Sequence, residues 1–326
     1  MVVTYMTPDQ LRVLENTAVS YDHWMQASRA LDQLLPALHW KTISNTDYLY
    51  ASTSNGTSKS FGKRTPETEQ LKASNDQQRI ELKRRIADTK ARLAMLSREY
   101  RAHYLPRVHP VFGAIAREAD LRGMMGSALL VIGTNAMPVY EIEAQDRFAT
   151  GLDATEDCDF AWADAVFSVG TVSGATPFYS LIKSVDASFA VNYERDFQAR
   201  NSKGYEVELL IAPSIAAQYP TRDPVRPLAL PQQEWLIRGR PLHHVLFDQS
   251  NLPVKLVVPD PRWMALHKLW LSKQPERNSL KRPKDAAQGE LLLKAVREKM
   301  PQYPLDENFI GELSMALKTI LKSLVP

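Results

Sequence analysis

Two stretches near the N-terminus carry apolar residues at helical spacing. In the first, from Thr7 onward, Pro8 falls in the first turn and the apolar positions recur three or four residues apart: Leu11, Leu14, Ala18, Tyr21 and Trp24. The second, from 65 to 103, surrounds its apolar positions with Arg and Lys: Leu82, Ile86, Leu93, Leu96 and Tyr100. Both patterns predict amphipathic helices, and the second is typical of a helical hairpin or a packing arm.

The segments between and after these two expected helices lack the helical spacing of apolar residues. Residues 44–60 are rich in Ser, Thr, Asn and Gly and predict a loop or an irregular strand pair. The apolar run 128–132 ends at Gly133, which indicates a buried strand that runs into a helix. We expect further strands at 157–162, 189–199 and 205–211, the last two joined by a glycine-containing turn, and then a proline-rich crossing segment without regular structure at 213–231.

The C-terminal part returns to a helical pattern. After an expected strand at 254–258, Pro259-Asp260-Pro261 begins a helix in which Trp263, Leu266 and Trp270 share a face, and the remainder reads as helical. The pattern therefore predicts an α+β protein in three parts. They are an N-terminal helical region (1–120), a core of mixed sheet with helices (121–258) and a C-terminal helical region (259–326).

Composition and charge narrow the function classes. A chain with 44% hydrophobic and 24% charged residues is typical of a globular protein. Its single cysteine, Cys158, excludes an internal disulfide framework and favours a cytoplasmic setting. No stretch approaches the roughly 20 apolar residues that span a bilayer, so we expect no membrane partner. The formal charge of +3 is small, but basic residues gather along 79–107 and 262–284.

Asp157 and Asp159 are the first candidates for chemistry. They lie two positions apart in an expected strand, so both side chains project from the same face of the sheet. Two neighbouring carboxylates with hard oxygen ligands suit Mg²⁺ or Mn²⁺. In the strand 205–211, Glu208 stands between Val207 and Leu209, where a lone buried charge would be costly, so it is expected to face a cation or a cleft. Glu206 shares that face and is the alternative.

A glycine-led turn precedes this strand pair. The sequence Gly133-Thr134-Asn135 places a glycine and a hydroxyl at an expected strand-to-helix junction, where backbone N–H groups can approach a phosphate. A dinucleotide-binding loop would need G-x-G-x-x-G, and only one glycine is present here.

These residues resemble the polymerase-β-like nucleotidyltransferase superfamily, in the order Gly133-Thr134, Asp157-x-Asp159 and a later acidic strand residue. More closely, the chain is similar to the bacterial GSU-type nucleotidyltransferase-fold family. The resemblance rests on blocks at 61–69, 133–136, 154–159, 201–210 and 259–269. It implies a polymerase-β-like core, metal binding by Asp157 and Asp159 with Glu208 as third carboxylate, and triphosphate contacts near Gly133, Thr134 and Asn135. The third acid is Glu where Asp is usual.

The phosphates of a bound NTP would need cations in addition to the metal. Lys268 in the expected C-terminal helix is the preferred contact. Further basic residues follow at 277–284, and Arg64 is a weaker candidate. His267, beside Trp263 and Trp270, is interpreted as a packing residue rather than a general base. The histidine spacing does not suit a structural zinc site.

Three functions remain open at this point. The first is a metal-dependent transferase that moves a nucleotide from an NTP such as ATP to an RNA end, with tRNA bound by the basic helix 79–107. Toxin or defence use is one setting for it. The second is nucleotidylation of a protein or a small molecule. The third is a non-catalytic nucleic-acid-binding module that has kept the fold.

Overall fold

The computed structural model describes residues 5–52, 58–148, 157–164 and 177–324. It divides into two compact units, each of which is described by itself. The N-terminal unit comprises Asn16–Leu96, and the core unit comprises Met1–Glu15 with Ser97–Pro326. The chain passes between them within helix α1 (Pro8–Gln33) and again within helix α2 (Pro66–Ala102).

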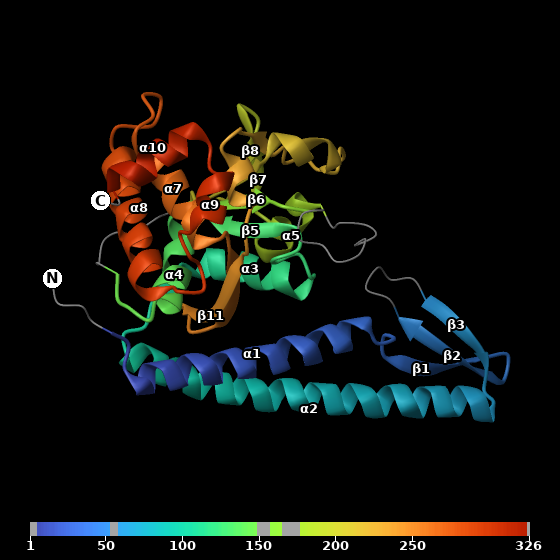
Figure 1. The fold of residues 1–326 in the computed structure, drawn as a ribbon. Coiled ribbons are helices and arrows are strands. Elements are labelled where there is room, and N and C mark those ends of the chain that lie inside the picture. Colours follow the sequence, from blue (N-terminus) through green and yellow to red (C-terminus); the bar gives the residue numbers. More distant parts are fainter. Residues whose placement is uncertain (1–4, 53–57, 149–156, 165–176, 325–326) are drawn as a thin grey trace. The chain divides into compact units, whose positions relative to one another are not determined.

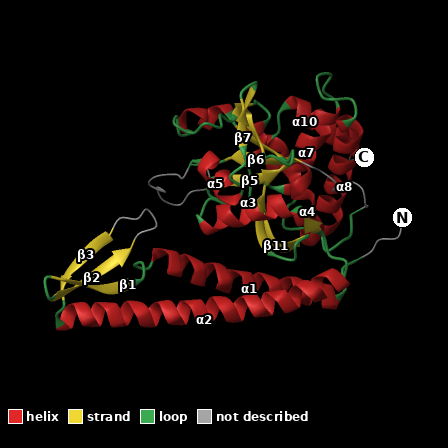
Figure 2. Cartoon of the chain, turned by 180° about the vertical axis from the view of Figure 1, so that it is seen from behind, coloured by secondary structure: helices red, strands yellow, loops and turns green. Residues whose placement is uncertain are grey.

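Both long helices expected near the N-terminus are present. In the N-terminal unit α1 and α2 lie side by side (Figures 1 and 2). The Lys90 ammonium of α2 lies 5.6 Å from the centre of the Trp24 ring on α1. Arg79 donates a hydrogen bond of 2.9 Å to the carbonyl of Leu35, just after α1. The polar residues of α2 cover the remaining, exposed surface of this helix, as the sequence pattern predicts.

A three-stranded antiparallel sheet connects the two helices, where the sequence predicted a loop or an irregular strand pair. Its strands are β1 (Leu38–Ile43), β2 (Thr46–Ser52) and β3 (Ser58–Lys63). Leu38, Leu49 and Ala51 form a small buried cluster on one face, with Trp40 and Phe61 packed against it. The alternative of an irregular strand pair is confirmed by β2 and β3, whose register shifts between Leu49 and Tyr50, whereas β1 was not expected. The apolar side chains that hold the sheet together meet only after the strands pair, and the polar composition hides them.

The core unit is built on a mixed sheet with the strand order β5-β6-β9-β8-β7. Its strands are β5 (Leu129–Ile132), β6 (Asp157–Trp162), β7 (Ala190–Asn192), β8 (Arg195–Arg200), β9 (Glu206–Ile211) and β10 (Leu228–Ala229). The central pair, β6 and β9, is parallel, whereas β5 and β8 flank it in antiparallel directions. The short β10 pairs with the end of β9. A mixed sheet with helices confirms the expected α+β class.

A second, smaller sheet has the order β12-β11-β4, with β4 (Arg107–Val108), β11 (Leu242–Asp248) and β12 (Pro253–Val258). The helices of the core unit are α3 (Pro110–Leu121), α4 (Met137–Glu143), α5 (Phe178–Val185), α6 (Gln233–Leu236), α7 (Pro261–Ser272), α8 (Lys281–Lys299), α9 (Glu307–Glu312) and α10 (Met315–Leu324). Two 3-10 helices, η1 (Gly133–Ala136) and η2 (Pro213–Gln218), also belong to the unit.

Among the described residues, no helix is long and apolar enough to span a bilayer.

Two expectations about the strands need correction. Residues 189–199 do not form one strand: β7 and β8 are antiparallel neighbours joined at Tyr193-Glu194, a turn that lacks glycine and proline. The proline-rich segment 213–231 is not wholly irregular, since it contains η2 and β10. The expected strands at 128–132, 157–162, 205–211 and 254–258 are present within one or two residues.

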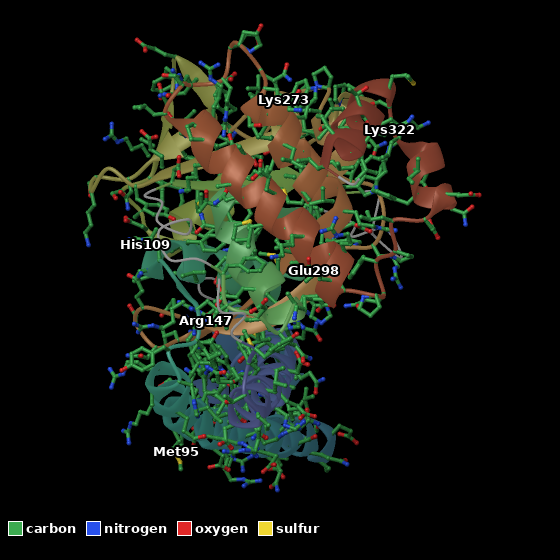
Figure 3. All side chains as sticks on the ribbon, turned by 60° about the vertical axis from the view of Figure 1, so that its left-hand side comes forward. Met95, His109, Arg147, Lys273, Glu298 and Lys322 are labelled. Atoms are coloured by element: carbon green, nitrogen blue, oxygen red, sulfur yellow. The ribbon has the colours of Figure 1, made fainter. Side chains whose placement is uncertain are left out.

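Helices α7 and α8 pack closely against each other. Lys273 marks the end of α7 and Glu298 the end of α8 in Figure 3. A Cβ atom at Gly289 of α8 would lie 2.7 Å from Leu269 Cγ and 2.9 Å from the Leu269 backbone nitrogen. The absence of a side chain at this position therefore permits the close approach of the two helices.

Candidate active site

The register of the central strands brings the candidate carboxylates together. Asp157 pairs with Glu206 and Asp159 pairs with Glu208, in parallel β6 and β9. Because alternate residues share a face, all four carboxylates line one cavity of about 670 Å³. The intervening residues of both strands are buried on the other face. The strand alternation that the sequence predicted thus produces an acidic wall.

The surroundings of Asp159 on this wall disfavour the charged form of its carboxyl. Burial raises the pKa of its carboxyl, and the nearby carboxylates Glu208 and Asp157 raise it further. Lys268 and Lys281 oppose the effect, and the resulting pKa is about 7. A carboxylate held among like charges gains from any cation that enters the cavity.

Gln198 of β8 orients the neighbouring acids. Its side chain is buried, and its Nε2 donates to Glu208 Oε1 at 3.0 Å and to Glu206 Oε2 at 3.1 Å. Gln198 is also the register partner of Glu208. This positioning residue was not found from the sequence, because the segment was expected to be one continuous strand and its pairing partner was not known.

The glycine-led turn lies directly against Asp159. Gly133 has a φ of +69°, and a Cβ atom there would lie 2.3 Å from Asp159 Oδ2. Both the backbone conformation and the space therefore require glycine. Gly133 and Thr134 line the cavity. Asn135 is not among the lining residues; it is buried, and its Nδ2 donates to the Asp157 carbonyl at 2.9 Å, which joins the turn to β6.

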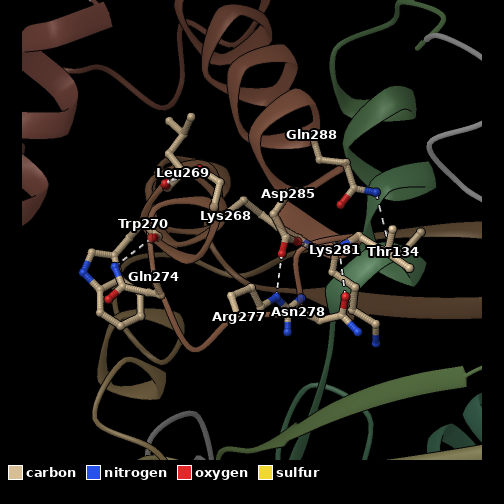
Figure 4. A network of polar contacts seen from close by, with 12 residues as sticks. Thr134, Lys268, Leu269, Trp270, Gln274, Arg277, Asn278, Lys281, Asp285 and Gln288 are labelled. Atoms are coloured by element: carbon tan, nitrogen blue, oxygen red, sulfur yellow. Dashed lines mark hydrogen bonds and ion pairs between the residues drawn. The ribbon is translucent and has the colours of Figure 1, made fainter. Parts of the chain in front are cut away.

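The opposite wall comes from α7, α8 and the segment between them. Lys268 is buried, with its ammonium 2.9 Å from Asp285 Oδ1, and Arg277 Nε lies 2.8 Å from Asp285 Oδ2 (Figure 4). Burial alone would raise the pKa of Asp285, but these two cations outweigh it and lower the pKa. Lys268 thus lines the cavity as part of an ion-paired group of two cations and one carboxylate.

The more exposed cations of this wall reach toward the acids. Lys281 Nζ lies 3.5 Å from Asp157 Oδ2, and Lys284 also lines the cavity. Gln288 Nε2 lies 3.4 Å from Thr134 Oγ1, so α8 contacts the glycine-led turn as well (Figure 4). Arg200 lines the cavity 3.7 Å from Glu206. Apart from Arg200 of β8 and the ion-paired Asp285 of α8, the cavity therefore has carboxylates on the sheet side and cations on the helix side.

Two basic residues considered from the sequence are placed elsewhere. Arg282 is not among the residues that line the cavity. Arg64 belongs to the N-terminal unit, where it forms ion pairs with Asp47 and Glu69 at 3.3 and 2.7 Å.

The donor set fits a hard divalent cation. Among the described residues, no group of three or more His, Cys, Asp or Glu side chains is arranged closely enough to hold a metal ion. The carboxylates of Asp157, Asp159 and Glu208 nevertheless share one face in register, and burial together with repulsion from the other two acids raises the Asp159 pKa. Oxygen ligands of this type suit Mg²⁺ and Mn²⁺.

His267 lines the cavity, although the sequence indicated a packing residue. It is buried beside Trp235, with the ring centres 6.3 Å apart. Burial lowers the pKa of its imidazole to about 3, with a further contribution from Lys268, so the ring is neutral near pH 7. A ring in this state is not a proton acceptor of useful strength.

Comparison with known proteins adds one finding. A family model described as Nucleotidyltransferase matches residues 111–311, which covers the mixed sheet, α7 and α8. No curated protein and no solved structure matches the chain. The match confirms the expected fold class, a nucleotidyltransferase core with flanking helices.

Proposed function

Because the chain belongs to the nucleotidyltransferase family, we propose that it transfers a nucleotide from an NTP to an acceptor hydroxyl at an RNA end, with tRNA as the preferred class. The observation that carries this proposal is the division of one cavity into an acidic sheet wall and a basic helix wall. A nucleoside triphosphate with its divalent cations matches both walls. The sequence blocks noted above support a place near the GSU-type proteins.

Asp157, Asp159 and Glu208 would hold the metal. Bound Mg²⁺ or Mn²⁺ supplies charge neutralisation at the phosphates and lowers the pKa of the acceptor hydroxyl. The carboxylates fit this role because they share a face and because burial and the neighbouring acids destabilise Asp159 as an anion. Gln198 fixes the orientation of Glu208 through one of its oxygens.

The triphosphate would lie between the two walls. Lys281, Lys284 and Arg277 are the cations we assign to it, with Gly133 and Thr134 on the side of the turn. Lys268 contributes as part of its buried pair with Asp285, and Asn135 as a positioning residue that holds the turn on β6. Most of the work of the protein in such a transfer is positioning and neutralisation of charge.

In the transfer, the acceptor oxygen forms a bond to the α-phosphorus and the bond to the β-phosphate oxygen breaks, so that pyrophosphate leaves. The proton of the acceptor hydroxyl passes to a carboxylate of the acidic wall, for which we choose Glu208. Its longer side chain, compared with the usual Asp, extends this carboxylate by one methylene toward the acceptor. The single cysteine, free and buried, is compatible with the reducing cytoplasm that we propose as the setting.

The test is transfer of label from α-labelled NTPs, incubated with Mg²⁺ or Mn²⁺ and a cell extract separated into RNA and protein. We expect a labelled RNA band. Asp157→Asn and Asp159→Asn should each reduce labelling by about a hundredfold or more. Glu194→Gln, an exposed carboxylate in the β7–β8 turn, is the matched control and should leave it unchanged.

The alternative outcomes separate the other candidates. A labelled protein or small molecule in place of RNA would support the same chemistry with another acceptor. If Asp157→Asn and Asp159→Asn leave both Mg²⁺-dependent NTP binding and the effect of the protein on RNA intact, the protein is a non-catalytic binding module. The transferase proposal would then be wrong.

A further inference from the structure

The cavity continues beyond the carboxylates into an apolar end. Leu210 follows Glu208 on the same face of β9, and Leu230 and Leu271 line the cavity with it. Gln232 also lines the cavity, and the two buried polar residues of this end are Gln233 of α6 and His267 of α7. They are only 2% and 5% exposed. The cavity thus combines apolar walls with two deeply buried polar side chains.

These polar groups have unused hydrogen-bonding capacity. Within the described part of the chain, Gln233 Oε1 and both ring nitrogens of His267 have no hydrogen-bond partner. Buried polar atoms in native proteins are nearly always paired, because an unpaired one loses its hydration without compensation. Three such atoms on residues that line one cavity indicate that a ligand supplies the missing partners.

The chemistry of the two residues defines the ligand. A carboxamide oxygen accepts a hydrogen bond, and a neutral imidazole offers one donor and one acceptor nitrogen. Apolar walls with a few placed polar groups are typical of small-molecule sites, and a heterocyclic base is a ligand of this kind. Leu210 is the next residue after Glu208 on the same face of β9, and Glu208 is assigned to the metal, so the base of a bound nucleotide has room on this side of its phosphates.

We propose that Gln233 and His267 form a nucleobase subsite that selects an exocyclic amino group next to an unprotonated ring nitrogen, as in adenine and cytosine. Gln233 Oε1 accepts from the amino group, and the imidazole N–H of His267 donates to the ring nitrogen. Guanine and uracil present a carbonyl oxygen and an N–H at these positions, so acceptor would meet acceptor and donor would meet donor. This inference rests on the proposed NTP-dependent function.

The experiment measures calorimetric affinities for ATP, CTP, GTP and UTP in Mg²⁺, with inorganic triphosphate as a probe of the phosphate subsite alone. We expect ATP, CTP or both to bind at least about tenfold more tightly than GTP and UTP. His267→Phe, which keeps a planar ring, and Gln233→Leu should each reduce that preference to less than about threefold. Neither change should alter the affinity for inorganic triphosphate. Relative affinities of ATP and CTP show whether the subsite takes a purine, a pyrimidine or both.

His244→Phe is the control, since His244 pairs with Glu143 at 2.7 Å and does not line the cavity. It should leave the order of the four affinities unchanged. Equal affinity of the wild-type protein for all four NTPs, or an unchanged order in both His267→Phe and Gln233→Leu, would overturn the subsite while leaving the proposed transfer intact. Failure to bind any NTP or triphosphate would instead contradict the proposed function. Thermal melting of each variant verifies that it is folded.

Discussion

The raised pKa of Asp159 couples the stability of the protein to pH. Burial, Glu208 and Asp157 raise this pKa from 3.8 to about 7, so the folded protein holds the proton more tightly than the unfolded chain does. The stabilising contribution is therefore complete below about pH 4 and is lost as pH rises through 7. Near neutral pH, the metal-free protein carries an electrostatic cost at this site.

Replacing the carboxyl group by an amide tests this coupling. In EDTA, Asp159→Asn should be more stable than the wild type at pH 8 by roughly 1 to 3 kcal/mol, and the difference should disappear near pH 4. Denaturant unfolding at the two pH values measures it. Asp196→Asn, at an exposed position on β8, should show no such pH-dependent gain. An equal effect of Asp159→Asn at both pH values would mean that folding does not raise the pKa of this carboxyl.

Individual site residues differed in how well the sequence could predict them. Strand alternation predicted that Asp157 and Asp159 share a face and that Glu208 faces a cleft, and β6 and β9 have that geometry. Gln198 and Gln233 carry no local signal, since their importance comes from partners that are far away in sequence. His267 resembled a packing residue because its neighbours along the chain are apolar, and only the cavity distinguishes it.

At the scale of elements, the contact between α7 and α8 sets the position of the basic wall. Gly289→Ala would place a Cβ atom 2.7 Å from Leu269 Cγ and 2.9 Å from the Leu269 backbone nitrogen. Alanine normally favours a helix over glycine by about 1 kcal/mol, but overpacking should reverse the sign here and destabilise the protein by about 1 to 3 kcal/mol. Because α8 carries Lys281 and Lys284, NTP affinity should fall as well.

Gly311→Ala in α9 provides the matched control. A Cβ atom there has no heavy atom within 4 Å, so this change should be neutral or slightly stabilising and should not affect NTP binding. Urea denaturation and calorimetric NTP titration of both variants measure the effects. If Gly289→Ala behaved like Gly311→Ala, the helices would have room to separate, and the close packing would not position the cations.

Elements with a strong local period were predicted better than those defined by distant pairing. The α2 helix has a consistent apolar stripe, and its expected limits of 65 and 103 differ from Pro66–Ala102 by one residue at each end. Strands β1 to β3 have few apolar residues and become a sheet only through pairing. Strand β11 had no expectation at all, because its histidines at 243 and 244 interrupt any regular alternation and its partners are β12 and the distant β4.

For the whole molecule, the distribution of charge is more informative than its sum. The formal net charge is only +3, yet α2 exposes Lys83, Arg85 and Arg92 to solvent. Cations along a helix are a common means of binding the phosphates of nucleic acids, without any need for sequence recognition. This helix is therefore the part of the molecule that we expect to bind an RNA acceptor.

Combined substitution of these three residues by Gln tests the expectation. Each phosphate contact that is lost should reduce the salt dependence of binding, so three contacts should lower the slope of log affinity against log salt by about 2. Fluorescence anisotropy with labelled tRNA between 50 and 200 mM salt gives this slope. The control removes the same charge at exposed positions of the core unit: Arg222, Lys273 and Lys322.

The two outcomes distinguish a local contact from a general charge effect. If the triple change on α2 weakens tRNA binding and the control does not, the helix contacts the RNA backbone. If both changes act equally, only the net charge matters and α2 is not the binding element. NTP affinity should stay constant in both variants, since none of the six residues lines the cavity. A loss of NTP affinity would instead mean that α2 supports NTP binding. The two measurements therefore distinguish a role of α2 in RNA binding from a role in NTP binding.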